Sequence, residues 1–86
     1  MTEIETRWTN EATRALVGRK IVKVQYLGKK DCENMGWDDS GIALILDNGN
    51  TVILQQDDEG NGPGALLILS KTAEVILPTL YVGQVS

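Results

Sequence analysis

This chain has 86 residues, of which 42% are hydrophobic and 23% are charged; its net charge is -4 and it contains no histidine. The length fits a single domain spanning residues 1–86, and a domain this small buries only about 60–65% of its unfolded surface. The acidic balance argues against general nucleic-acid binding, which depends on Lys and Arg side chains that neutralise phosphates.

The sequence shows no pattern typical of export or of membrane insertion. No uninterrupted apolar run is longer than that of residues 65–69, which is far shorter than the roughly 20 residues that span a bilayer. The N-terminal segment is acidic where a signal peptide is basic, and the single Cys32 has no partner for an internal disulfide. We therefore expect a cytoplasmic protein with no membrane contact.

Residues 3–17 have the pattern of an amphipathic helix. Thr2 and Glu5 have the spacing of a capping box, and Gly18 is well placed just beyond the last turn. One apolar stripe repeats every four residues and consists of Ile4, Trp8, Ala12 and Leu16. We expect Trp8 to pack in the core; the alternative is that it anchors a partner.

A strand and a short helical turn are expected next. Residues 20–27 alternate apolar and polar side chains, which is typical of a strand with one side toward a core and one toward water. Asp31 can cap a helical turn over residues 32–35, which Gly36 would end.

Two side chains in this part of the chain invite a functional interpretation. Trp37 lies on an extended segment, where it is either a lid over the end of a barrel or an exposed binding aromatic. Cys32 has lysines nearby, but the chain has no histidine that could act as its base. We interpret Cys32 as a structural thiol rather than a nucleophile.

The centre of the chain predicts a β-hairpin, because Asn48-Gly49 lies between two apolar runs. A two-residue loop would place Leu44 opposite Ile53, whereas a three-residue loop with Gly49 in the left-handed region would place Leu44 opposite Val52. The second register gathers on one face Ile42, Leu44, Leu46, Val52 and Leu54. We therefore predict the three-residue loop. The other face is still half apolar, and we expect a helix or another subunit to cover it.

An acidic, glycine-rich loop follows the hairpin. Four oxygen-bearing side chains lie close together in it: Asp57, Asp58, Glu59 and Asn61. They could wrap a hard cation such as Ca²⁺ or Mg²⁺, although their spacing does not match an EF-hand. We interpret residues 56–65 as a structural loop whose acids face water and whose Asn61 bonds to local backbone. Trp37 and these four side chains are the candidate ligand- or partner-binding residues.

The remaining chain predicts further strands. Continuous apolarity predicts a buried strand over residues 65–69, a returning strand over residues 74–77 and a short edge piece over residues 80–82. We expect an α+β, mostly β domain. In it the N-terminal helix (residues 1–17) packs on a five-stranded bent antiparallel sheet or small open barrel of SH3-like type (residues 20–82).

Three short motifs lie between residues 17 and 66: MGW at residues 35–37, LxLDxG at residues 44–49 and DxEGN at residues 57–61. In these motifs the chain resembles a group of small bacterial proteins for which no activity is established. The resemblance implies a bacterial accessory protein and transfers no catalytic residue.

Three classes of function remain. A homo-oligomeric protein-interaction or assembly module comes first, because the apolar residues exceed what one thin sheet needs. Binding of a divalent cation or a small ligand through residues 57–61 is the alternative. An enzyme would have to rely on carboxylates alone, since the chain has no histidine, no P-loop and no dinucleotide fingerprint. We therefore expect neither catalysis nor a cofactor.

Overall fold

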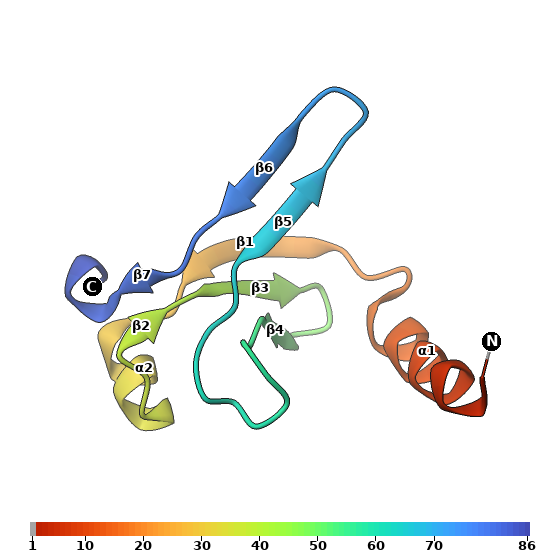
Figure 1. Cartoon of the computed structure of the whole chain (residues 1–86), viewed down its shortest axis with the longest axis horizontal. Helices are drawn as coiled ribbons and strands as arrows, with labels where there is room; N and C mark the ends of the chain where they lie inside the picture. The colour runs from red at the N-terminus through yellow and green to blue at the C-terminus, as the bar shows by residue number, and fades with distance from the viewer. Residues whose placement is uncertain (1) are drawn as a thin grey trace.

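The computed structural model describes residues 2–86 (Figure 1). The elements are, in chain order, α1 (Glu3–Leu16), β1 (Ile21–Tyr26), α2 (Lys29–Met35), β2 (Asp39–Ser40), β3 (Ile42–Leu46), β4 (Thr51–Ile53), β5 (Leu66–Leu69), β6 (Glu74–Leu77), β7 (Leu80–Tyr81) and the 3-10 helix η1 (Val82–Gln84). Within residues 2–86 no helix is long and apolar enough to cross a membrane.

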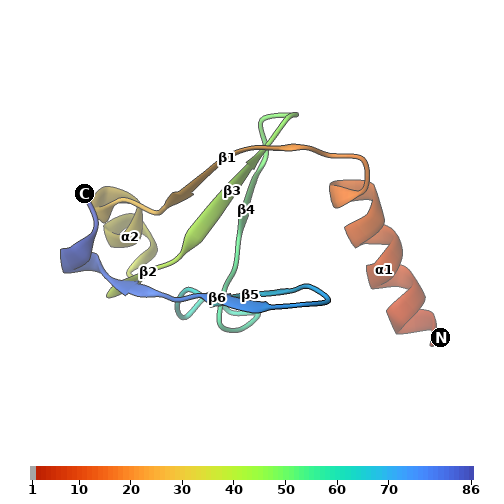
Figure 2. The same ribbon diagram turned by 90° about the horizontal axis from the view of Figure 1, so that it is seen from above.

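Helix α1 begins where the sequence predicts and ends at Leu16, one residue before the predicted end. The Glu5 N–H donates to Thr2 Oγ1 over 3.1 Å, and the Thr2 hydroxyl donates to Glu5 Oε1 over 3.3 Å. Gly18 follows the helix with a φ of 79°, in the left-handed region that commonly ends helices. Its packing differs from the prediction: α1 has no buried residue, and Trp8 is 60% exposed. Both views show α1 standing away from the strands, so the expectation that Trp8 packs in the core is wrong (Figures 1 and 2).

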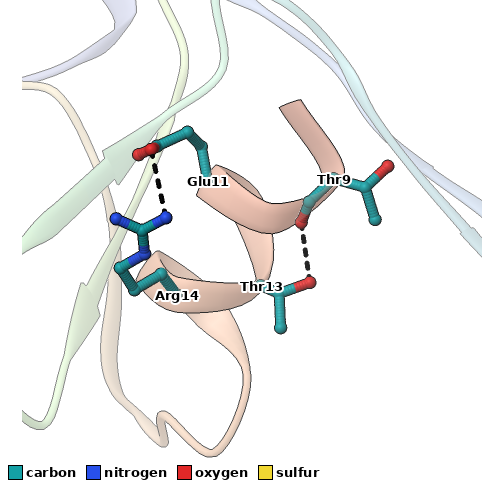
Figure 3. A network of polar contacts seen from close by, with 4 residues as sticks. All are labelled: Thr9, Glu11, Thr13 and Arg14. Carbon is teal, nitrogen blue, oxygen red and sulfur yellow. Dashed lines mark hydrogen bonds and ion pairs between the residues drawn. The ribbon is translucent and has the colours of Figure 1, made fainter. Parts of the chain in front are cut away.

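Two polar contacts in the middle of α1 are local to the helix (Figure 3). Thr13 Oγ1 donates to the Thr9 carbonyl one turn earlier over 2.7 Å, and Arg14 lies 3.3 Å from the Glu11 carboxylate. Exposed ion pairs of this kind contribute only about 0.3–0.5 kcal/mol. They support the helical conformation but do not attach α1 to the sheet.

Strands β1, β3 and β4 form an antiparallel sheet with β3 at its centre. Leu44 lies opposite Val52, and Gly49 has a φ of 88°. The Leu46 N–H donates to the Asn50 carbonyl over 2.9 Å, which closes a three-residue loop. The predicted register and the left-handed Gly49 are therefore confirmed.

Helix α2 lies at one end of the β3–β4 sheet and contributes to the core. The main cluster of the core consists of Leu27, Cys32, Trp37 and Ala43, with Ile53 and Val82 packed against it. Ile42 and Leu46 are buried as well. Ala43 and Ile53 belong to the half-apolar face of the hairpin. Helix α2 reaches this face through Cys32, but a hollow remains between the rest of α2 and the face, so the helix covers it only in part. Gly36 ends α2 with a φ of 73°, as predicted, but α2 starts after Gly28 rather than after Asp31.

The remaining strands do not complete a barrel, and the predicted five-stranded SH3-like sheet is wrong. In the described part of the chain, β2 pairs only with β7, and β5 pairs only with β6. The β5–β6 hairpin extends away from the three-stranded sheet (Figures 1 and 2). The connection between β4 and β5 folds back on itself instead, with Gln55 bridged to Pro63. This local closure takes the place of the strand pairing that a barrel requires.

Several strands predicted to be buried lie at the surface. The strand predicted over residues 65–69 forms as β5 from Leu66, but Leu69 is 69% exposed. On β1, Val24 is 53% exposed, so the predicted core-facing side of this strand is also largely uncovered. A short apolar run predicts a strand, whereas burial needs a second layer that this chain does not place there.

The chain is extended for its size. It exposes 6568 Å², whereas a compact monomer of 9.4 kDa exposes about 5,000 Å², so the excess is about 1,500 Å². Its radius of gyration is 14.5 Å, compared with about 12 Å for a compact domain of this length. The exposed surface is large because α1 and the β5–β6 hairpin do not pack against the three-stranded sheet.

Candidate functional site

The acidic loop is organised around the carboxylate of Asp57. Asp57 Oδ1 accepts hydrogen bonds from the main-chain N–H groups of Glu59 and Asn61 over 3.0 Å and 3.2 Å. The Asn61 side-chain amide donates to Asp57 Oδ2 over 2.8 Å. The Asn61 side chain thus bonds within the loop, but its partners are the carboxylates of Asp57 and Glu59 and not the local backbone that was predicted.

These bonds favour the ionised carboxylate. The side-chain amide of Asn61 is the largest cause, followed by the Asn61 main-chain N–H, and together they hold the pKa of Asp57 below its ordinary value of 3.8. Asp57, Asp58 and Glu59 are all exposed, as predicted. Ionised Asp57 thus ties the loop together while its neighbours face water.

This arrangement does not resemble a cation site. No group of three or more His, Cys, Asp or Glu side chains in residues 2–86 is placed to hold a metal ion. Asn61 directs its N–H donors at Asp57 and, over 3.3 Å, at Glu59 Oε2. A Ca²⁺ or Mg²⁺ site would instead need the amide oxygen of Asn61 turned inward with the carboxylates. The geometry favours the structural interpretation of the loop.

Trp37 joins the acidic loop to the core. Its ring is only 5% exposed, and its Nε1–H donates to the Gly60 carbonyl over 2.7 Å. Gly60 can present this carbonyl because it has a φ of 74°, a conformation that other residues rarely adopt. Trp37 is thus a buried core side chain, and the interpretation of it as an exposed binding aromatic is wrong. Trp37 is the one buried residue among the five predicted site residues. It contacts the acidic loop but does not reach the surface.

Cys32 is also part of the core. It is fully buried, and its Sγ lies 3.7 Å from the Leu27 carbonyl, which also accepts a 2.6 Å hydrogen bond from Ser40 Oγ. A thiol enclosed in this way has no access to a substrate. The structural interpretation of Cys32 agrees with this burial.

A hollow of about 320 Å³ lies between α2 and the sheet. Its apolar wall includes Met35, Ala43, Ile45 and Ile53, and Asp31 and Asn34 border it. It holds no pair of side chains arranged for acid–base or nucleophilic chemistry. The lining residues come from α2 and three strands, so no contiguous sequence signal pointed to this hollow.

The apolar stripe of α1 faces open space. Ile4 is 72% exposed and Leu16 is 47% exposed, and Trp8 lies between them along the stripe. A second hollow, of about 480 Å³, is bordered by Trp8 and by Asp58 of the acidic loop. The stripe is therefore an uncovered apolar surface with free volume beside it.

The β5–β6 hairpin carries apolar side chains on both faces. Directly opposed residues point to the same side of an antiparallel pair, and Leu67 lies opposite Ile76 while Ile68 lies opposite Val75. One face therefore carries Leu67, Leu69 and Ile76 together with Glu74, which lies opposite Leu69, and the other carries Leu66, Ile68, Val75 and Leu77. Ile76 is 61% exposed. A sequence prediction of a buried strand correctly found these apolar residues but missed that they form a surface.

No protein-family model matches this chain, and no curated protein or solved structure is significantly similar to it.

Proposed function

We propose that this chain is a homo-oligomeric assembly module that acts through protein–protein contacts in the bacterial cytoplasm and catalyses no reaction. The observation that supports the proposal best is the uncovered apolar surface on α1 and on the β5–β6 hairpin. Monomeric proteins rarely expose contiguous apolar patches larger than a few hundred Å², and larger ones are typical of interaction sites. The exposed large hydrophobic side chains on these two elements are Ile4, Trp8, Leu16, Leu67, Ile68, Leu69, Val75 and Ile76.

The stability of the two elements supports the same conclusion. A helix of about 12–15 residues is marginal in water without tertiary packing, and α1 has 14 residues, none of them buried. An isolated two-stranded hairpin is also marginal. Both elements gain stability if a second protein surface covers their apolar side chains, at roughly 25 cal/mol for each Å² of apolar area removed from water.

The test is the mass of the protein in solution. Sedimentation equilibrium of the full chain at micromolar concentration should give at least twice the monomer mass of 9.4 kDa. The melting temperature should also rise with protein concentration, because dissociation accompanies unfolding in such assemblies. A monomer across the micromolar range, with a melting temperature independent of concentration, would overturn the proposal.

A further inference from the structure

We propose that the hollow of about 320 Å³ between α2 and the sheet binds a small arylalkylamine, a molecule with an aromatic ring on a short chain that ends in an ammonium group. The ring lies on the apolar floor of the hollow, and the ammonium group bonds to the carboxylate of Asp31. This binding goes beyond assembly and does not depend on the oligomeric state of the chain.

The floor of the hollow is one face of the three-stranded sheet. Gln25 of β1 lies opposite Ala43 of β3, which in turn lies opposite Ile53 of β4. Opposed residues of antiparallel strands point to the same side, and Ile45 and its opposite residue Thr51 share this side, two positions along the strands. With neighbouring strands about 4.8 Å apart, the floor is about 10 Å wide. A planar ring can therefore lie on its apolar centre.

Helix α2 forms the wall of the hollow through side chains on one of its faces. Asp31, Asn34 and Met35 border the hollow, and their spacing of three and four residues places them on the same side of the helix. Met35 is 38% exposed, and a methionine thioether is flexible and makes favourable contacts with aromatic rings. The wall thus offers an aromatic ligand an adaptable apolar contact beside a carboxylate.

The polar side chains around the hollow are free to bond to a ligand. Most binding sites for small molecules combine an apolar lining with a few polar groups that orient the ligand, and their volumes begin at about 300 Å³. The hollow has this composition and this size. Within residues 2–86, no hydrogen bond or ion pair involves the side chains of four residues that line it: Gln25, Asp31, Asn34 and Thr51.

The charge at the rim favours a cation. Among the described residues that line the hollow, Asp31 is the one with a charged side chain. Lys30 and Lys29 lie about 100° and 200° around the helix from Asp31, and neither forms an ion pair with it. An ammonium group beside this carboxylate gains a charge-assisted hydrogen bond, whereas an anion of the same shape is repelled.

Titration of the full chain with tryptamine, followed by the NMR shifts of the backbone amides, tests the proposal. We expect saturable binding with a dissociation constant below about 1 mM, with the largest shift changes at α2, Ala43 and Ile45. N-acetyltryptamine and indole-3-propionate keep the ring but remove or reverse the charge. Both should bind at least about fivefold more weakly, because they cannot donate a charge-assisted hydrogen bond to Asp31.

Three variants locate the site. Asp31→Asn should weaken tryptamine binding at least about fivefold and remove most of the preference for tryptamine over N-acetyltryptamine. Glu33→Gln is the matched control, because it removes the same charge from α2 at a residue that does not line the hollow; it should leave binding unchanged. Thr51→Trp places a large ring at the floor and should weaken the binding of both amine and amide. Thermal unfolding checks that each variant remains folded.

Several results would contradict the proposal. The absence of saturable tryptamine binding in the millimolar range would remove the site altogether. Equal binding of tryptamine and N-acetyltryptamine would show that charge does not select the ligand, and equal losses in Asp31→Asn and Glu33→Gln would assign the effect to net charge. Shift changes centred on Trp8 or on the β5–β6 hairpin would place the binding on the exposed apolar surfaces instead. None of these results alters the outcome of the sedimentation test of assembly, so the two proposals fail independently.

Discussion

Trp37 Nε1 donates a 2.7 Å hydrogen bond to the main-chain carbonyl of Gly60, 23 residues further along the chain. The bond fixes the acidic loop to the small core below it, because the Trp37 ring packs with Leu27, Cys32 and Ala43. One side chain therefore links the folding of the core to the conformation of a loop whose acids are exposed.

Two substitutions at Trp37 should separate packing from hydrogen bonding. Trp37→Ala removes a buried aromatic ring and should reduce the free energy of unfolding by about 3–5 kcal/mol. Trp37→Phe keeps an aromatic ring but removes the donor, and a loss of about 1–3 kcal/mol is expected from the unpaired Gly60 carbonyl and the smaller ring. Denaturant unfolding measures both values. Equal losses in the two variants would show that the hydrogen bond, and not ring volume, dominates.

Gly49 should tolerate a β-branched residue poorly. Its φ of 88° lies in the left-handed region, and Gly49→Val should cost about 1–3 kcal/mol of backbone strain. Gly83→Val is the matched control, because an added Cβ at either glycine meets no atom within 4 Å but Gly83 does not have a positive φ. Chemical denaturation of the two variants gives the comparison. A Gly49→Val protein as stable as the control would contradict the left-handed loop.

Asp57 should make loop stability depend on pH. Its hydrogen bonds with Asn61 and Glu59 place its folded-state pKa below the ordinary value of 3.8. A depressed carboxyl pKa stabilises the fold above the unfolded-state value, and this contribution is lost as the pH falls through 3.8 toward the lower folded-state pKa. Thermal unfolding measured from neutral pH down through this range should show the loss.

Asp57→Asn removes the titrating group and should flatten that part of the pH profile. Asp58→Asn is the matched control, since no hydrogen bond of the loop is made by Asp58 among those described. Asp58→Asn should leave the pH dependence of thermal stability below the ordinary pKa of Asp57 largely unchanged. A profile that is equally steep in the wild type and in Asp57→Asn would assign the acid sensitivity to other carboxylates.

Calcium should stabilise the protein little. A bound cation at 100 times its dissociation constant would stabilise the fold by about 2.7 kcal/mol, which is several degrees in melting temperature for a domain of this size. Because Asn61 turns its N–H donors toward Asp57, we expect only weak screening by millimolar Ca²⁺. A rise of several degrees that Asp58→Asn abolishes would instead establish the loop as a cation site.

The sequence by itself determined the features that depend on neighbouring residues. Thr2 caps α1, Gly36 ends α2 and Gly49 sets the register of the central hairpin, as predicted. Each outcome depends on backbone preferences and hydrogen bonds within a few positions of the chain. The Asn61 side chain likewise finds its partner, Asp57, only four residues away.

Only the tertiary structure decided what those elements pack against. The apolar repeat of Trp8 and the apolar run of β5 predict their conformations correctly but not their exposure. An apolar pattern indicates that a surface is more stable when buried. Which segment covers that surface depends on distant parts of the chain or on other chains. The pairing of β2 with β7 and the bond from Trp37 to Gly60 are likewise long-range contacts. No local pattern specifies such contacts, because the free energy that selects them comes from the packing of the whole fold.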